Sequence, residues 1–344
     1  MINFIYKMFF IFMLFIGTLM TISSSSWLGM WMGLELNLMS FIPLISEKNN
    51  LNSTEMSIKY FLVQALASLV FLFMSIMYML KFSNFNYIFM NYESILMIFS
   101  LMLKLGAAPF HFWFPNIIEG LSWLNTLFLL TWQKLAPLTI ISYFIFIDQM
   151  LFFIIISTIV GSIGGFNQTS LQKLLSFSSI NHIGWLLMAM IYSNFLWLLY
   201  FFIYSIMNFS LILIFYLYNI FNMNQLYLFN NNGMSNNLLK ICFFMNLLSL
   251  GGLPPFLGFF PKWMVIEYLI MDKMFFLVFL LVMMTLLTLF FYIRLTLTSF
   301  LLYYPTMKWI FLNFKNKMII KIMILLNLLN MLFFWWFLFN NYLF

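Results

Sequence analysis

Charged residues are scarce in this chain: they make up 7% of its 344 residues, and only eight residues are acidic. This scarcity excludes a soluble domain, because 65% of the residues are hydrophobic and no soluble fold could hide so much apolar surface. Cysteine is almost absent as well. With Cys242 alone, an internal disulfide, a multi-cysteine metal site and an iron–sulfur centre are excluded, and a glycine fingerprint for nucleotides is also missing. We therefore expect a polytopic membrane protein that binds no redox cofactor and no metal itself.

Positive charge is too thinly spread to form a nucleic-acid surface. The net charge is +7, but its lysines are scattered over short loops, and Arg294 is the only arginine. This distribution favours lipid headgroups over nucleic acid as the partner of the basic residues. The abundance of Phe, Met, Asn and Lys beside a single arginine is typical of an AT-rich organellar genome, such as a mitochondrial one.

Long apolar runs divide the chain into eleven expected transmembrane helices, because one span needs about 20 apolar residues. Helices are expected because only internally bonded backbone is stable in lipid, and the alternating pattern of a membrane barrel is absent. The spans are 2–22, 27–46, 58–80, 93–118, 121–146, 150–168, 171–191, 195–219, 240–270, 274–303 and 318–339. The predicted fold is an all-α polytopic membrane protein, with residues 1–344 forming a single transmembrane domain.

The loop lysines predict the orientation of these spans. Nine lysines fall on the side of the N-terminus, and only Lys81 and Lys273 fall on the opposite side. The nine are Lys7, Lys48, Lys59, Lys173, Lys240, Lys308, Lys315, Lys317 and Lys321. By the positive-inside rule the N-terminus faces the cytoplasm-like compartment, which in a mitochondrion is the matrix. The C-terminus would then face the intermembrane space.

A few charges remain inside the predicted spans: the cations Lys104, Lys134, Lys262 and Arg294, and the acid Glu35. A charge at the centre of a bilayer costs about 2.5–3.5 kcal/mol on insertion scales, so such residues are usually functional. The structural alternative is a static buried ion pair. For Arg294 that alternative is as strong as a functional role, because a guanidinium does not readily release its proton.

Two stretches of the chain echo each other. "LGAAPFHFWFPN", from Leu105, and "LGGLPPFLGFFPK", from Leu250, each combine a Leu-Gly start, a proline break, aromatic residues and a second proline. We pair Gly106 with Gly251 and Pro115 with Pro261, with one inserted residue. The stretches lie five spans apart, so the copies should point in opposite directions, as in the inverted repeats of transporters. We expect half-repeats at about 2–146 and 150–303, each with one broken helix, and a C-terminal helix at about 318–339.

The repeat also aligns further polar residues. The span after each break carries Lys134 or Arg294, and the second span before each break carries Glu35 or His182. For His182, in "SSINHIGW", a satisfied core histidine remains an alternative. The same alternative applies to His111, and for Glu267 an interfacial charge is as plausible as a functional one.

The helix breaks explain how water can reach a lysine at membrane depth. Proline lacks an N–H and frees backbone carbonyls, which are tolerated in the membrane only where protein or water lines a cavity. Lys104 immediately before such a break can therefore meet water. Desolvation disfavours the charged form of a lysine and a nearby carboxylate favours it, so a lysine between these influences can load and release a proton.

Several longer motifs carry a family resemblance. "GTLMTISSSSWLGMWMGLELNLMSFIPLIS", "KYFLVQALAS", "KLGAAPFHFWFPNIIEGLSW", "TWQKLAPL", "GGFNQTSLQKLLSFSSINHIGW" and "NLLSLGGLPPFLGFFPKW" closely resemble the NADH dehydrogenase subunit 2 family. These are the mitochondrially encoded, antiporter-like subunits of respiratory complex I, and the sequences of the motifs are arthropod-like. The match runs from about residue 17 to 265, with a looser tail.

The resemblance implies an eleven-helix, proton-translocating module of the membrane arm in the mitochondrial inner membrane. On matching positions, Glu35 resembles the acid of the family's Glu–Lys pair and Lys104 its lysine. Lys134 resembles the central connecting lysine, His182 a polar link in the central axis, and Lys262 the lysine at the second broken helix.

The resemblance also implies partners. They are other membrane-arm subunits of the complex, antiporter-like neighbours among them, and membrane lipid such as cardiolipin. NAD, FMN, iron–sulfur clusters and ubiquinone would be used by partner subunits. Two alternatives stay open: an autonomous cation/proton antiporter of the same fold, and a non-conducting membrane scaffold that keeps its lysines as static pairs.

Overall fold

A computed structural model describes residues 2–46, 50–82, 90–144, 146–230, 234–254 and 256–301 of the chain, and nearly all of this backbone is helical. The helices are α1 (Ile2–Ser23), α2 (Trp27–Ile45), α3 (Leu51–Phe82), α4 (Met90–Leu105), α5 (Trp113–Glu119), α6 (Trp123–Leu130), α7 (Trp132–Ile141), α8 (Ile147–Gly164), α9 (Leu171–Tyr192), α10 (Asn194–Tyr218), α11 (Met234–Gly251), α12 (Phe259–Met271) and α13 (Phe275–Leu301), with a 3₁₀ helix, η2, at Met223–Asn230. Within the described ranges the β-structure is one isolated bridge between Ser170 and Asn222. The predicted all-α fold class is therefore confirmed.

The helices account for ten of the expected spans. Seven of them, α1, α2, α3, α8, α9, α10 and α13, are each long and apolar enough to cross a bilayer. Three more spans are interrupted and consist of the helix pairs α4–α5, α6–α7 and α11–α12. The eleventh expected span, 318–339, and the lysines from Lys308 to Lys321 lie outside the described residues.

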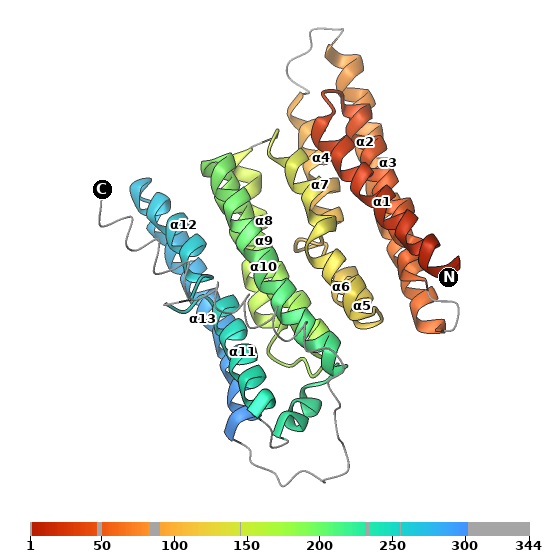
Figure 1. Cartoon of the computed structure of the whole chain (residues 1–344). Coiled ribbons are helices and arrows are strands. Elements are labelled where there is room, and N and C mark those ends of the chain that lie inside the picture. The colour runs from red at the N-terminus through yellow and green to blue at the C-terminus, as the bar shows by residue number, and fades with distance from the viewer. Residues whose placement is uncertain are drawn as a thin grey trace. The chain divides into compact units, whose positions relative to one another are not determined.

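The chain divides into two compact units, residues 1–157 and 158–344. In the first unit α1, α2 and α3, drawn in red and orange in Figure 1, run alongside one another. Glycines permit the close approach of α1 and α2. A Cβ on Gly17 would meet Asn37 Oδ1 at 2.5 Å, and one on Gly33 would meet Gly17 O at 2.8 Å, as expected where small residues bring membrane helices together.

In the second unit α9 is the central helix. Nearly all of α9, from Leu171 to Met190, is buried among other helices, whereas α1 exposes large apolar side chains such as Ile5, Phe9 and Phe12. Ser193 begins α10 by accepting a hydrogen bond from Leu196 N, and Asn219 ends it in the left-handed conformation at φ 51°. The single cysteine, Cys242 on α11, is buried.

The interruption between α6 and α7 was not expected. It lies at Thr131, whose hydroxyl donates a hydrogen bond to Leu127 O at 2.7 Å, and α7 then runs through Pro137 without ending. Pro137, three residues after Lys134, cannot supply the N–H that would bond to residue 133, so the sequence favours a distortion there, but the helix break itself lies before the lysine. Thr131 adopts φ −116° and ψ −72°, and hydroxyl back-bonding of this kind often bends a helix.

Candidate functional site

The first broken helix ends in a glycine cap. Gly106 adopts φ 71°, and its N–H donates to Leu103 O, while Ala107 N–H donates to Met102 O. These two bonds define the Schellman motif, in which a left-handed glycine turns the chain out of the helix. Proline follows at Pro109, where the helix could not continue. The chain restarts as a helix at Trp113, two residues before Pro115.

The second broken helix repeats this cap. Gly252 adopts φ 82°, its N–H donates to Ser249 O, and Leu253 N–H donates to Leu248 O. The structural partner of Gly106 is therefore Gly252, so the pairing with Gly251 was wrong by one position. With Gly252 in register the two stretches align through Pro115 and Pro261 without an inserted residue. Gly251 and Gly252 are adjacent in the sequence, and only the left-handed backbone conformation of Gly252 distinguishes them. A sequence does not show this conformation.

The two breaks satisfy their freed carbonyls differently. In the first, Gln64 Nε2 donates to Lys104 O at 3.3 Å and Trp113 Nε1 donates to Leu103 O at 3.1 Å. In the second, Lys262 Nζ donates to Gly251 O at 3.0 Å and to Leu250 O at 3.4 Å. The cation of the second break thus binds the negative end of a helix, where a positive charge is stabilised.

Lys104 and Lys134 line one cavity in the first unit. Both are buried, with 8% and 2% of their surfaces exposed, and the Lys134 ammonium lies 5.3 Å from the centre of the Phe114 ring, within cation–π range. The cavity leaves about 20 Å³ for the centres of water molecules. One water needs roughly 10–15 Å³ by this measure, so the cavity that both lysines line has room for water.

Two further polar groups in this lining call for water. Asn37 Oδ1 and Gln133 Nε2 are buried and make no hydrogen bond with the described part of the chain. Buried polar atoms of this kind are normally satisfied by ordered water when protein supplies no partner. That the first break meets water stays a prediction, and the cavity beside Lys104 and Leu105 has the room it needs.

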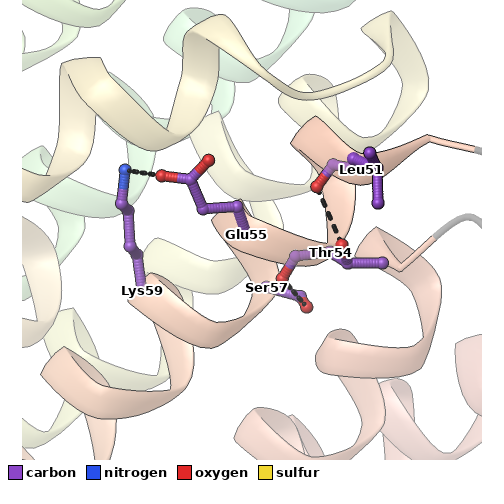
Figure 2. Close-up of polar contacts among 5 residues, drawn as sticks. All are labelled: Leu51, Thr54, Glu55, Ser57 and Lys59. Carbon is purple, nitrogen blue, oxygen red and sulfur yellow. Dashed lines mark hydrogen bonds and ion pairs between the residues drawn. The ribbon is translucent and has the colours of Figure 1, made fainter.

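Glu35 interacts electrostatically with Lys104 without touching it. The carboxylate is half-buried on α2 and acts on the lysine. Among the described residues, however, the ion pair within 4.0 Å is a surface one, between Lys59 Nζ and Glu55 Oε1 at 2.6 Å on α3 (Figure 2). Glu35 and Lys104 thus interact electrostatically and form no direct ion pair.

His182 and Lys262 lie in the second unit. His182 is buried on α9, and its Nδ1 shares a hydrogen bond of 2.9 Å with the Tyr200 hydroxyl on α10. The Tyr204 ring lies 5.0 Å from the imidazole. The five predicted site residues therefore fall into two groups, Glu35 with Lys104 and Lys134 in the first unit, and His182 and Lys262 in the second.

The remaining candidates have plain structural surroundings. Arg294 Nη2 donates to Phe166 O at 2.7 Å and so caps the turn after α8. His111 Nδ1 lies 3.2 Å from Pro109 O, and its ring lies over Phe112. Glu267 is exposed on α12. Within the described ranges no three His, Cys, Asp or Glu side chains gather as metal ligands would.

Sequence reasoning missed the polar partners of the lysines and of His182. Gln64 interrupts an apolar run and was a visible signal. Tyr200 and Tyr204 gave no such signal, because tyrosines are common among the apolar residues of membrane helices. Only their separation by four residues indicates that both lie on one helix face.

The family model and the related sequences that match this chain come from one group of membrane proteins. The family model of NADH:quinone oxidoreductase/Mrp antiporter transmembrane proteins matches residues 24–288. The chain is 50% identical over 311 residues to the NADH-ubiquinone oxidoreductase chain 2 of Anopheles gambiae, covering 90% of each chain. It is 40% identical over 324 residues to that of Locusta migratoria, covering 93% of this chain and 92% of the relative.

Two solved structures share the fold at low identity. A chain of respiratory complex I from Thermus thermophilus with bound aureothin matches with a TM-score of 0.84 and 21% identity, over 96% of this chain and 78% of that one. A chain of the Mrp complex from Dietzia sp. DQ12-45-1b matches with a TM-score of 0.73 and 17% identity, over 86% of this chain and 61% of that one.

Proposed function

This chain belongs to the NADH-ubiquinone oxidoreductase chain 2 family, within the NADH:quinone oxidoreductase/Mrp antiporter membrane proteins, and on that premise we propose that it is the proton-translocating, antiporter-like membrane subunit of a respiratory complex I. The observation that carries the proposal is the cavity lined by Lys104 and Lys134, which has room for water and is also lined by Asn37 and Gln133, each with a buried polar atom that makes no hydrogen bond within the described residues. A proton path needs titratable groups joined by water, and this cavity provides both.

Each lysine in the proposal has a distinct role. Lys104 loads and releases a proton under the electrostatic influence of Glu35. Lys134 exchanges protons with Lys104 through water in the cavity and holds its ammonium at the Phe114 ring. Water suits this exchange because it accepts one proton as it donates another, so charge moves without movement of the helices.

The second unit continues the path in this proposal. His182, hydrogen-bonded to Tyr200, passes protons toward Lys262. The Lys262 ammonium donates to two carbonyls of the second break, so its third N–H remains available to pass on a proton. The chemistry of this chain is proton transfer alone.

Electron transfer then belongs to partner subunits, which would use NAD, FMN, iron–sulfur clusters and ubiquinone. The direct partners would be other membrane-arm subunits, antiporter-like neighbours included, and lipids such as cardiolipin. The location would be the mitochondrial inner membrane, with the N-terminus in the matrix and the C-terminus in the intermembrane space, as the loop lysines predict.

Substitution of Lys134 tests the proposal. Lys134→Met keeps much of the side-chain length but carries no proton, and we expect an assembled complex, because removing a buried charge need not destabilise a protein. We expect proton uptake per NADH to fall in reconstituted vesicles, and NADH oxidation to slow where the two are tightly coupled. Lys134→Arg should also impair uptake, because a guanidinium holds its proton too firmly.

Lys59→Met is the matched control, since Lys59 is 49% exposed and pairs only with Glu55 at the surface. Assembly is checked on a native gel. Normal uptake by a fully assembled Lys134→Met complex would favour the non-conducting scaffold. Cation/proton exchange by the purified chain alone would favour an autonomous antiporter.

A further inference from the structure

Helix α9 carries polar residues on two faces. Ser179 and His182 point toward α10, whereas Ser178 and Asn181 lie against α13. In each pair the residues are three positions apart, so they are neighbours on one side of the helix. All four are buried, which is costly in a membrane protein unless the groups are hydrogen-bonded or functional.

Two tyrosines face the first pair. The Tyr200 hydroxyl is hydrogen-bonded to His182 Nδ1 at 2.9 Å, and the Tyr204 hydroxyl lies at the side chains of Ser179 and Asn208. Tyr200 and Tyr204 are one helical turn apart on α10 and interact electrostatically. They extend the polar contacts of His182 along the α9–α10 interface by one turn.

Helix α13 faces the second pair. Asn181 Nδ2 donates to Thr288 Oγ1 at 3.5 Å, and one turn further along α13 the Tyr292 hydroxyl lies beside Ser178. Tyr292 also interacts electrostatically with Tyr204. Tyr204 and Tyr292 are therefore the residues through which the two polar interfaces influence each other.

Tyr292 also borders the second broken helix. A Cβ built on Gly251 would lie 3.7 Å from the Tyr292 ring, and the Gly251 carbonyl accepts the hydrogen bond of Lys262 Nζ at 3.0 Å. Tyr292 thus packs against the residue that holds the Lys262 ammonium. The polar contacts that begin at His182 end beside this residue.

Two atoms along this route make no regular hydrogen bond within the described part of the chain. They are Asn181 Oδ1 and the Tyr292 hydroxyl, in residues only 2% and 1% exposed. The neighbouring Ser178 hydroxyl donates to Leu175 O at 2.8 Å. An orphaned buried hydroxyl is unfavourable for stability, so it calls for ordered water or a functional reason.

We propose that the hydroxyls of Tyr200, Tyr204 and Tyr292, with intervening water, carry protons between His182 and the second broken helix that holds Lys262. In each transfer a phenol oxygen accepts a proton as it gives up its own, so its O–H bond is exchanged and nothing is oxidised or reduced. The inference rests on the proposed proton-translocating function and names the groups of the second unit that perform it.

Tyr292→Phe is the decisive variant. Its hydroxyl lies beside Ser178 and makes no regular hydrogen bond within the described part of the chain, so a purely structural role predicts a complex of about equal stability with normal pumping. The relay predicts a stable complex whose proton uptake rate falls by about tenfold or more, since a positioned proton-transfer group contributes roughly 10²–10⁴-fold to a rate. The solvent deuterium isotope effect on turnover should also rise, because the remaining transfer becomes rate-limiting.

Tyr200→Phe and Tyr204→Phe should lower uptake in the same direction. Tyr216→Phe is the matched control on α10, because Tyr216 is 42% exposed and lies outside the polar interfaces. Uptake is measured with the assembled complex in vesicles, and assembly on a native gel.

The outcomes separate the relay from the function on which it rests. Normal uptake and an unchanged isotope effect in Tyr292→Phe, together with loss of uptake in Lys134→Met, would overturn the relay and leave the proposed function standing. Normal uptake in both variants would overturn both.

Discussion

The two broken helices share a backbone and differ in chemistry. Both end in a Schellman motif on a left-handed glycine, Gly106 or Gly252. In the first, the freed carbonyls are bound by the neutral side chains of Gln64 and Trp113, and Lys104 precedes the break. In the second, Lys262 follows the break and its ammonium folds back onto the carbonyls.

This difference shows that the helix break and the nearby lysine have separate structural origins. The glycine cap forms the break without a charge, so a lysine is not needed to terminate either helix. In the first unit the ammonium remains available to the cavity, whereas in the second it also serves as a hydrogen-bond donor to the helix end. The first arrangement favours exchange with water and the second favours holding a proton in place.

The breaks also differ in how tightly they pack. Phe112 of the first break is 74% exposed. Its counterpart in the aligned second stretch is Gly258, where an added Cβ would collide with the carbonyl oxygen of Ser249. At the second break the start of α12 therefore packs directly against the end of α11.

The largest effect should come from breaking this tight contact. We expect Gly258→Ala to remove most of the assembled complex, because the collision is with backbone, which cannot rotate away as a side chain can. The measurement is complex content on a native gel. Phe112→Ala is the control at the equivalent position, and it should assemble normally. Normal assembly of Gly258→Ala would show that the second break is as loosely packed as the first.

A smaller effect is expected at the caps themselves. Gly106→Ala and Gly252→Ala each place a Cβ in the left-handed region, at a cost of about 1–2 kcal/mol. Gly252→Ala should be the more damaging, since its Cβ would lie 2.8 Å from Lys262 Nζ and push the ammonium off its carbonyls. The measurement is the temperature at which the solubilised complex loses half of its activity.

Gly251→Ala is the control for both caps, because its Cβ would meet nothing closer than 3.5 Å. Equal losses from Gly106→Ala and Gly252→Ala would mean that the Lys262 contact contributes nothing beyond the cap.

The smallest effect should follow loss of the neutral donor in the first break. Gln64→Leu removes the amide that binds Lys104 O, and a neutral hydrogen bond of this kind contributes about 1 kcal/mol. Water in the adjoining cavity can replace the donor, so we expect a decrease in thermal stability no larger than this. A loss as large as that of Gly252→Ala would show that the cavity does not supply such a water.

The sequence predicted those features that depend on composition and length. Apolar runs located ten spans within the described residues, and the glycine–proline stretches located both glycine-capped breaks. The interruption at Thr131 was missed because no glycine or proline occurs there. The register of the repeat was missed because Gly251 and Gly252 differ only in backbone conformation.

The candidate site was predictable where a charge stands in an apolar run. Lys104 and Lys134 were found in this way, and the structure brings them to one cavity. Tyr204 and Tyr292 were not found, because they come from different helices and become neighbours only through tertiary packing. Buried polar atoms without partners, such as Gln133 Nε2, can be recognised only in three dimensions.

Because its single cysteine is buried, the chain has no accessible native thiol that would compete with an introduced cysteine for a thiol reagent. Cys242 lies within α11 with 8% of its surface exposed, so a membrane-impermeant maleimide would modify this subunit only at a cysteine placed on purpose. Lys7→Cys at the N-terminal end of α1 and Phe195→Cys at the start of α10 provide such reporters, in separate variants. The lone thiol therefore allows the compartment that faces each of these two positions to be read by mass spectrometry, one label at a time.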